Sequence, residues 1–329
     1  MPRLHELNIT IGDLSAGPNN AITDVPGIRI GNTTVQEKGR LNTGVTAIVP
    51  DALPIPAAVF SGNGYGKLIG VTQIQELGEI ETPILLTSTL SAFKVADFLI
   101  SWMLDQPGHE ETKSLNPVVG ETNDGHLSDI RSRAITQQHV FDALNGATSG
   151  EVEEGCVGAG TGTRTLGFKG GIGTSSRTVT LTDDDQPETS FGPFTVGALV
   201  QSNFGGTLTL QGKRYPAPDV DQVEKGSCMI VVATDAPLDA RQLERVAKRA
   251  VFAMARVGAS YSHGSGDYGI TISTRKGGFV SDSVLSPLFT ATMDAVEEAL
   301  LNSLLMAETT HGPNGHMCGS LLDAYPEIG

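Results

Sequence analysis

The residue with the clearest chemical potential is Ser227, which stands where a polar segment gives way to an apolar one. Residues 211–226 contain prolines and several charges and end in Gly226, and residues 228–233 read CMIVVA. A serine at the head of a buried strand is held in place by the sheet, which suits a nucleophile. Glycine before it tolerates unusual backbone angles, which would let the hydroxyl attack the preceding carbonyl.

Attack by the Ser227 hydroxyl on the Gly226 carbonyl would be an N-to-O acyl shift, and hydrolysis of that ester would free the Ser227 amine. An α-amine has an ordinary pKa of about 7.7–8.0, so it can act as a base near neutral pH. It could take the proton of its own hydroxyl, as in other N-terminal nucleophile systems. We therefore interpret Gly226-Ser227 as a self-cleavage site, although Gly-Ser is also a common turn pair.

Several other motifs are incomplete. Gly158 to Gly162 resembles a dinucleotide loop, but Thr163 occupies the position of the last glycine. Gly66-Lys67 is followed by Leu68, so the hydroxyl residue of a phosphate loop is missing. The G-x-S-x-G nucleophile elbow is absent as well. These departures argue against nucleotide binding and against an α/β-hydrolase.

The cysteines and histidines predict neither a disulfide framework nor a metal site. Cys156, Cys228 and Cys318 are widely spaced and odd in number. His311 and His316 lie in a glycine-rich stretch whose spacing from Cys318 matches no common zinc motif, and they are expected on a surface loop. We expect no metal and no cofactor.

The composition narrows the possible partners. The 329 residues carry a formal net charge of −15, which disfavours nucleic acid. The chain contains no run of 18 apolar residues, so no membrane span is predicted. Met1 to Thr10 lacks the apolar core of a secretory signal, and a cytoplasmic location is expected.

The elements that must position Ser227 alternate irregularly between strands and helices. A helix is expected over 88–104, capped by Ser88 or Thr89, and another over 237–257 with Pro237 in its first turn and Gly258 at its end. The remaining expected elements are strands over 28–35, 44–49, 83–86, 178–182, 194–202, 228–233 and 268–273, helices over 128–144 and 285–307, an exposed turn over 183–189 and a polar linker over 211–226. This mixture favours an α+β architecture of sheets covered by helices, with a mixed doubly wound sheet as the alternative.

Ordered segments across nearly the whole chain resemble the DmpA-like family of L-aminopeptidase/D-Ala-esterase/amidases and β-peptidyl aminopeptidases. The matching segments are residues 20–27 (NAITDVPG), 63–67 (NGYGK), 76–78 with 82–84, 118–122 (VVGET), 167–177 (GFKGGIGTSSR), 200–206 (VQSNFGG), 226–227, 233–238 and 264–267. So many segments in one order make the resemblance specific.

The resemblance implies an αββα four-layer sandwich, like N-terminal nucleophile hydrolases and ornithine acetyltransferase but with connectivity different from the former. It implies one catalytic domain over residues 1–329, cut into residues 1–226 and 227–329 that stay together. It also implies tetramers of such pairs and release of N-terminal residues from small peptides, amides or esters without a metal.

The resemblance assigns a role to each matching side chain. Ser227 would be the nucleophile and its amine the base, and Asn203 would donate to the oxyanion. Ser265 would orient the Ser227 amine or relay its proton, and Asp267 would hold the positive charge of an amine. Glu121 would bind the free ammonium of the substrate, which explains an exo-acting enzyme.

One segment departs from the family. Relatives carry an aromatic residue in the loop after Glu121, whereas this loop reads Asn123-Asp124-Gly125-His126 without Tyr or Trp. Substrate preference among β-, D- and L-amino acids is left open. Acyl transfer to an amine acceptor, or a ligand-binding assembly that never matures, are the alternative functions.

Overall fold

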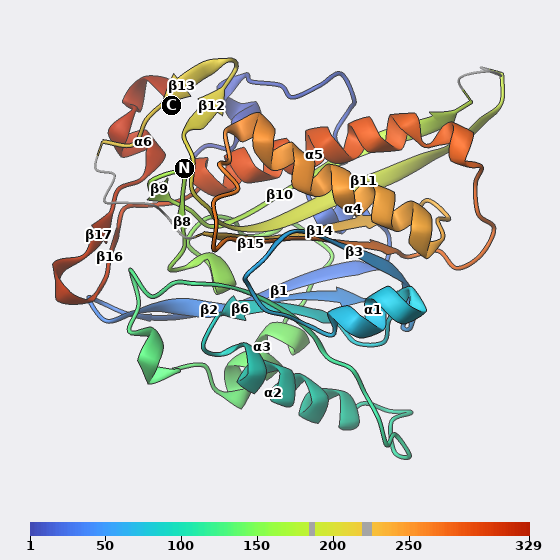
Figure 1. Cartoon of the computed structure of the whole chain (residues 1–329), viewed down its shortest axis with the longest axis horizontal. Helices are drawn as coiled ribbons and strands as arrows, with labels where there is room; N and C mark the ends of the chain where they lie inside the picture. Colours follow the sequence, from blue (N-terminus) through green and yellow to red (C-terminus); the bar gives the residue numbers. More distant parts are fainter. Residues whose placement is uncertain (184–187, 219–225) are drawn as a thin grey trace.

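Two β-sheets stacked face to face form the centre of the protein (Figure 1). The computed structural model describes residues 1–183, 188–218 and 226–329. In the six-stranded sheet, only the neighbours β14 and β15 are parallel. Its order is β10 (Ile172–Thr182), β11 (Ser190–Asn203), β14 (Ser227–Thr234), β15 (Gly266–Ser273), β3 (Ile55–Gly64) and β5 (Glu79–Ile80).

The second sheet has five strands, with β6 and β7 as its parallel pair. Its order is β1 (Ile28–Glu37), β2 (Leu41–Pro50), β6 (Ile84–Ser88), β7 (Val118–Thr122) and β4 (Leu68–Ile69). Gly120 of β7 packs directly against the Met229 side chain of β14, so the two sheets touch at their centres.

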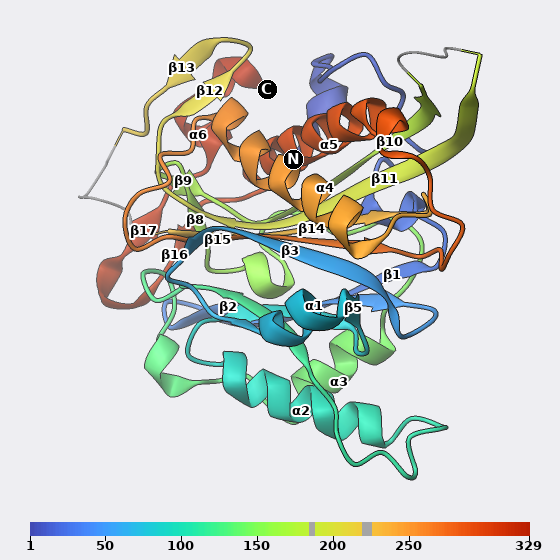
Figure 2. The ribbon, with the colours of Figure 1, turned by 45° about the vertical axis from the view of Figure 1, so that its right-hand side comes forward.

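Helices cover the outer face of each sheet, which gives four layers (Figure 2). The six-stranded sheet is covered by α4 (Ala240–Ala253) and α5 (Ser286–Leu305), and the five-stranded sheet by α2 (Ala92–Leu104) and α3 (Gln137–Asn145). The expected αββα sandwich is confirmed. The doubly wound alternative is wrong, because the strands divide between two stacked sheets.

Shorter elements connect the layers. They are α1 (Val71–Leu77), α6 (Leu321–Ala324), β8 (Arg164–Thr165), β9 (Phe168–Lys169), β12 (Leu208–Leu210), β13 (Lys213–Tyr215), β16 (Thr310–His311), β17 (Met317–Cys318) and the 3-10 helices at Leu4–Leu7, Ile22–Asp24, Ile130–Ser132, Gly158–Gly160, Met254–Val257, Asp282–Val284, Pro313–Gly315 and Pro326–Ile328.

Strand β14 lies between two apolar cores, and every one of its residues is buried. Ile230 and Val232 belong to the core under α4 and α5, whereas Met229 and Val231 belong to the core between the sheets. Successive side chains of a strand point to opposite faces, so a continuous apolar run is what a strand buried on both sides requires. This explains the CMIVVA segment after Ser227.

Some expected boundaries are wrong, for local reasons. Ser88 ends β6 and pairs with Thr122, so α2 begins later, after Ser91. Pro237 precedes α4, which is capped instead by Asp239 through a 2.7 Å hydrogen bond from the Gln242 N–H.

Two further expectations need correction. The expected helix over 128–144 is divided into the 3-10 helix at Ile130–Ser132 and α3, which Thr136 caps. The segment expected as a linker contains the hairpin strand β13, and residues 219–225 of that segment and 184–187 of the expected turn lie outside the described residues. Gly258, with φ 96°, ends the helical segment as expected. In the described part of the chain, no helix is long and apolar enough to cross a membrane.

A buried ion pair joins α5 to β10. Arg177 Nη2 lies 2.6 Å from Glu298 Oε2, and the two side chains are 2% and 7% exposed. Asn20 Nδ2 donates to the other carboxylate oxygen of Glu298 at 2.6 Å. The carboxylate therefore ties the N-terminal segment, the sheet and the helix together.

We expect Glu298→Ala to lower the free energy of unfolding by about 3–5 kcal/mol, because it leaves the Arg177 charge buried and unpaired. Urea denaturation measures this. Glu244→Ala is the matched control, since its pair with Lys248 is exposed and worth about 0.3–0.5 kcal/mol. Equal losses in the two variants would contradict this view of the buried pair.

Candidate active site

Ser227 is the first residue of β14 and lies in the middle of the six-stranded sheet. Its register partners are Asn203, the last residue of β11, and Gly266, the first residue of β15. The residue is 7% exposed. Strands β11 and β15 therefore fix the Ser227 backbone from both sides. Because Ser227 is the first residue of its strand, it lies at the edge of the sheet where β14 begins.

The Gly226-Ser227 bond is held by main-chain contacts. The Gly226 carbonyl accepts a hydrogen bond from the Gly266 N–H at 3.2 Å. A Cβ on Gly226 would lie 2.4 Å from Phe204 Cα and 2.7 Å from the Asn203 carbonyl oxygen. Space alone therefore excludes a larger residue at position 226.

Asn203 presents an oriented amide beside Ser227. Its Oδ1 accepts a hydrogen bond from the Arg164 backbone N–H at 2.9 Å, and the side chain is buried. Because the oxygen faces Arg164, the Nδ2 end of the amide is the one that can donate. That is the orientation an oxyanion donor needs.

Asp267 collects hydrogen bonds from three directions. Ser265 Oγ donates to its Oδ1 at 2.7 Å, and Asn63 Nδ2 donates to its Oδ2 at 3.1 Å. The backbone N–H of Cys228 donates to the carboxylate as well. Asp267 therefore holds the peptide unit that follows Ser227, which places a carboxylate close to the Ser227 amine.

Burial is the largest influence on these groups. It raises the pKa of the Asp267 carboxyl, and the hydrogen bonds from Ser265, Asn63 and Cys228 act in the opposite direction. Burial, together with the charge of Asp267, raises the pKa of the Cys228 thiol well above its usual range. The thiol next to Ser227 therefore stays neutral and does not compete as a nucleophile.

Glu121 lies on β7, opposite Thr87 of β6. Its Oε1 accepts a hydrogen bond from the Lys67 backbone N–H at 2.7 Å and lies 3.6 Å from Lys67 Nζ. Its side chain is only 2% exposed. Burial, together with the charge of Glu121, raises the pKa of the Tyr268 hydroxyl.

Two glycines bring Glu121 close to the nucleophile. A Cβ on Gly266 would lie 2.5 Å from Gly66 Cα and 3.2 Å from Ser227 Oγ. A Cβ on Gly66 would lie 3.1 Å from Gly266 Cα and 3.3 Å from Glu121 Oε1. The backbones at Gly66 and Gly266 therefore cross with no side chain between them. This crossing brings Glu121 of β7 and Ser227 of β14 to the same part of the site.

The loop after β7 carries the imidazole of His126 and no Tyr or Trp. The ring of His126 contacts that of His316 edge to face, with centroids 4.5 Å apart. His316 lies on an exposed loop, as expected. Burial raises the pKa of Asp124 to about 6. Ser88 Oγ donates a hydrogen bond to the Asp124 carboxylate at 2.9 Å, which acts in the opposite direction.

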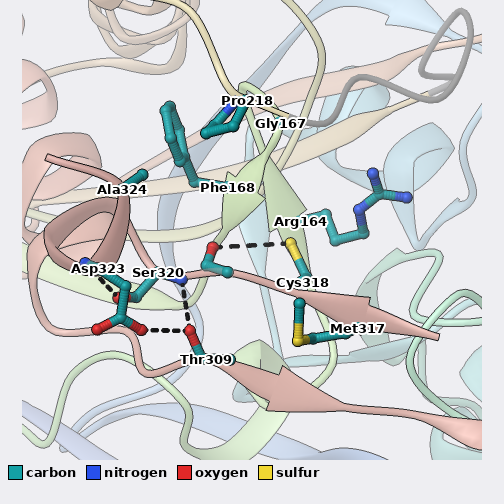
Figure 3. A pocket seen from close by; sticks show the side chains of 11 residues that line it. Arg164, Gly167, Phe168, Pro218, Thr309, Met317, Cys318, Ser320, Asp323 and Ala324 are labelled. Atoms are coloured by element: carbon teal, nitrogen blue, oxygen red, sulfur yellow. Dashed lines mark hydrogen bonds between the residues drawn. The ribbon is translucent and has the colours of Figure 1, made fainter. Parts of the chain in front are cut away.

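A cavity of about 260 Å³ lies beside this site (Figure 3). Arg164, whose N–H orients Asn203, is part of its wall, whereas Ser227, Ser265 and Asp267 are not. Its lining residues are Arg164, Gly167, Phe168, Pro218, Thr309, Met317, Cys318, Gly319, Ser320, Asp323 and Ala324. Thr309, Ser320 and Asp323 form a closed hydrogen-bonded group on one side.

The structure therefore brings together Ser227, Asn203, Ser265 and Asp267, and connects Glu121 to them through Gly66. Asn63, Gly266 and the Cys228 N–H were not singled out from the sequence. Asn63 belongs to the NGYGK segment, and Gly266 stands between two predicted site residues, so both were visible as motif members without a role.

Three comparisons with known proteins point to the same family. The model of peptidase family S58 matches residues 20–318. The β-peptidyl aminopeptidase BapA of Sphingosinicella microcystinivorans is 35% identical, over 96% of this chain and 88% of the relative.

Two solved structures are similar over their whole length. A β-aminopeptidase of Burkholderia sp. is 36% identical with a TM-score of 0.87, covering 100% of this chain and 99% of the other. The L-aminopeptidase D-Ala-esterase/amidase of Ochrobactrum anthropi is 33% identical with a TM-score of 0.88, covering 100% and 98%. The latter is described as a prototype of the serine aminopeptidases and a variant of the Ntn hydrolase fold.

We expect Gly266→Ala to abolish the self-cleavage that the sequence predicts, because its Cβ would displace Gly66 and press on Ser227 Oγ. Denaturing gels after expression show whether the chain is cut. Gly150→Ala is the control, since a Cβ there meets nothing within 4 Å. Normal cutting of Gly266→Ala would show that the close crossing is not required.

Proposed function

Because this chain belongs to peptidase family S58 and is a serine-type aminopeptidase and amidase, we propose that it cuts its own Gly226–Ser227 bond and then uses Ser227 for turnover. The observation that carries the proposal is the geometry of that bond. Its carbonyl already receives the Gly266 N–H at 3.2 Å, while the sheet fixes Ser227 next to it.

Maturation would proceed in two steps. Ser227 Oγ attacks the Gly226 carbonyl carbon, the C–N bond breaks, and an ester to Oγ forms as the amine takes up the proton. The Gly266 N–H is placed to stabilise the oxyanion of this step. Water then cleaves the ester, which leaves a carboxylate on Gly226 and a free amine on Ser227.

In turnover, the Ser227 amine would remove the proton of its own hydroxyl, which attacks the substrate carbonyl. Asn203 Nδ2 stabilises the oxyanion, because Arg164 orients its amide. Asp267 stabilises the protonated amine, and Ser265, bonded to it at 2.7 Å, orients the amine. The substrate amine leaves, and water releases the acyl group from Oγ.

Glu121 would select substrates with a free N-terminal ammonium. It is a buried carboxylate beside Gly66, close to the nucleophile. A carboxylate fixed on one side of the nucleophile admits only one residue beyond the scissile bond, so the enzyme removes N-terminal residues. The N-terminal residues that the relatives' names suggest are β- and L-amino acids, and the esterase activity of one relative concerns D-Ala.

The two pieces would stay together because they share a sheet. Strands β14 and β15 belong to residues 227–329, yet their outer neighbours β11 and β3 belong to residues 1–226. We also propose a tetramer of processed pairs, for which α2 exposes two large apolar side chains, Phe93 (69%) and Leu104 (45%). A cytoplasmic location stays a prediction from the sequence.

The comparisons support hydrolysis and give no support to acyl transfer or to a binding-only role. Hydrolysis and transfer differ in the group that takes the acyl chain from Ser227. Product analysis with and without an added amine acceptor distinguishes them, and release of free acid in both cases is the expected result.

We expect Ser227→Ala to abolish both self-cleavage and turnover, because the nucleophile and its position as a new N-terminus are lost together. A denaturing gel, N-terminal sequencing and an aminoacyl p-nitroanilide assay report the two effects. Ser132→Ala, at an exposed serine, is the control and should yield two pieces. Two pieces from Ser227→Ala would refute the assignment.

We expect Asn203→Ala to lower kcat by about 10²–10³ in protein that has matured, because one oxyanion donor is removed. KM should change much less, since the donor acts in the transition state. Steady-state kinetics on the matured fraction measures both. A kcat within threefold of the parent value would show that donors other than Asn203 stabilise the oxyanion.

A further inference from the structure

The carboxylate proposed to bind the substrate ammonium has a cation of the protein beside it. Lys67 Nζ lies 3.6 Å from Glu121 Oε1 and donates to Thr89 Oγ1 at 3.1 Å. The Lys67 side chain is 44% exposed, whereas that of Glu121 is 2% exposed. Lys67 is therefore the more accessible of the two opposite charges, which form one unit that we name the Lys67–Glu121 pair.

The backbone holds this pair against the nucleophile. The Lys67 N–H donates to Glu121 Oε1 at 2.7 Å, so the start of the lysine side chain is fixed on the carboxylate. The preceding residue, Gly66, crosses Gly266, which is the register partner of Ser227. Tyr268 fixes that crossing by donating its hydroxyl to the Gly66 carbonyl at 2.9 Å.

A lysine in this place changes which substrates Glu121 favours. A substrate with an ammonium alone must compete with Lys67 for the carboxylate. A substrate that carries an ammonium and a carboxylate on one carbon satisfies both charges, because its ammonium faces Glu121 and its carboxylate faces Lys67. The lysine stem is flexible enough to turn its charge toward such a carboxylate.

We propose that the Lys67–Glu121 pair recognises an N-terminal residue with a free α-amino-acid head group that is joined to the next residue through its side chain, the β-aspartyl residue. This inference rests on the proposed function. In a β-aspartyl peptide the free amine stands two carbons from the scissile carbonyl, as in a β-amino acid. The carbon that bears the amine also bears the carboxylate.

The reaction is the proposed hydrolysis without an additional reagent. Ser227 Oγ attacks the side-chain carbonyl of the β-aspartyl residue, the amide C–N bond breaks, and the shortened peptide leaves as its amine. Water then cleaves the ester and releases aspartate. Lys67 neutralises a carboxylate that would otherwise be repelled by Glu121 and by the net charge of the protein.

The test compares the matured enzyme on β-aspartyl-leucine and β-alanyl-leucine, which share the leaving group and differ by the carboxylate. Release of leucine gives kcat/KM for each. We expect the parent enzyme to favour β-aspartyl-leucine at least tenfold. We expect Lys67→Met to lower kcat/KM for β-aspartyl-leucine at least tenfold and to raise it about threefold for β-alanyl-leucine, because the competing cation is gone.

Two variants serve as controls. Lys67→Arg keeps the cation and should keep the preference for β-aspartyl-leucine. Lys276→Met removes an exposed lysine beyond the far end of β15, about 25 Å along that strand from Ser227, and should leave both rates unchanged.

Changes of opposite sign on the two substrates separate recognition from a structural role. If Lys67→Met lowers both rates equally, Lys67 only supports Glu121 and the inference is overturned. A parent enzyme that cleaves β-alanyl-leucine faster also overturns it, while the proposed function stands. If neither substrate is cleaved and Ser227 never becomes an N-terminus, the proposed function is refuted, and the inference that rests on it is refuted as well.

Discussion

The structure depends on the pairing of β14 with β15, two parallel strands buried at the centre of the six-stranded sheet. Parallel strands begin at the same edge of a sheet, so Ser227 and Gly266 lie side by side. That one register places the Gly266 N–H on the Gly226 carbonyl and puts Asp267 opposite Cys228. A slip of one residue would turn Ser227 to the other face and separate these groups.

Close packing of backbones makes this arrangement possible. A Cβ on Gly226 or Gly266 would collide with main-chain atoms, and one on Gly66 would lie 3.1 Å from Gly266 Cα. Without side chains between them, the main-chain N–H groups and the buried carboxylates come within reach of Ser227. The abundance of glycine in the chain is thus in part a requirement of the site, in addition to a requirement of its turns.

Burial of charged groups in the site costs free energy. Asp267 is fully buried and accepts hydrogen bonds from Ser265 and Asn63, and the nearly buried Glu121 accepts one from the Lys67 N–H and pairs with Lys67 Nζ. Such groups are stable only when their partners are fixed, which the sheet ensures for Asp267 and the Lys67 backbone for Glu121. Burial and the charge of Asp267 keep the Cys228 thiol neutral, so it does not compete with the Ser227 hydroxyl as a nucleophile.

From the sequence by itself, the residue pattern indicated sheets covered by helices and a buried strand after Ser227, and the family resemblance predicted the αββα layers and the grouping of Ser227, Asn203, Ser265 and Asp267. A continuous apolar run and ordered motifs are properties of residues that are neighbours in the chain, so they are visible without a tertiary structure. Asn63, Gly266 and Lys67 received no role, since their importance comes from contacts between segments that are distant in the chain. Only the tertiary structure decided that Gly226 is required for space, because the atoms it would strike belong to β11 and the turn after it.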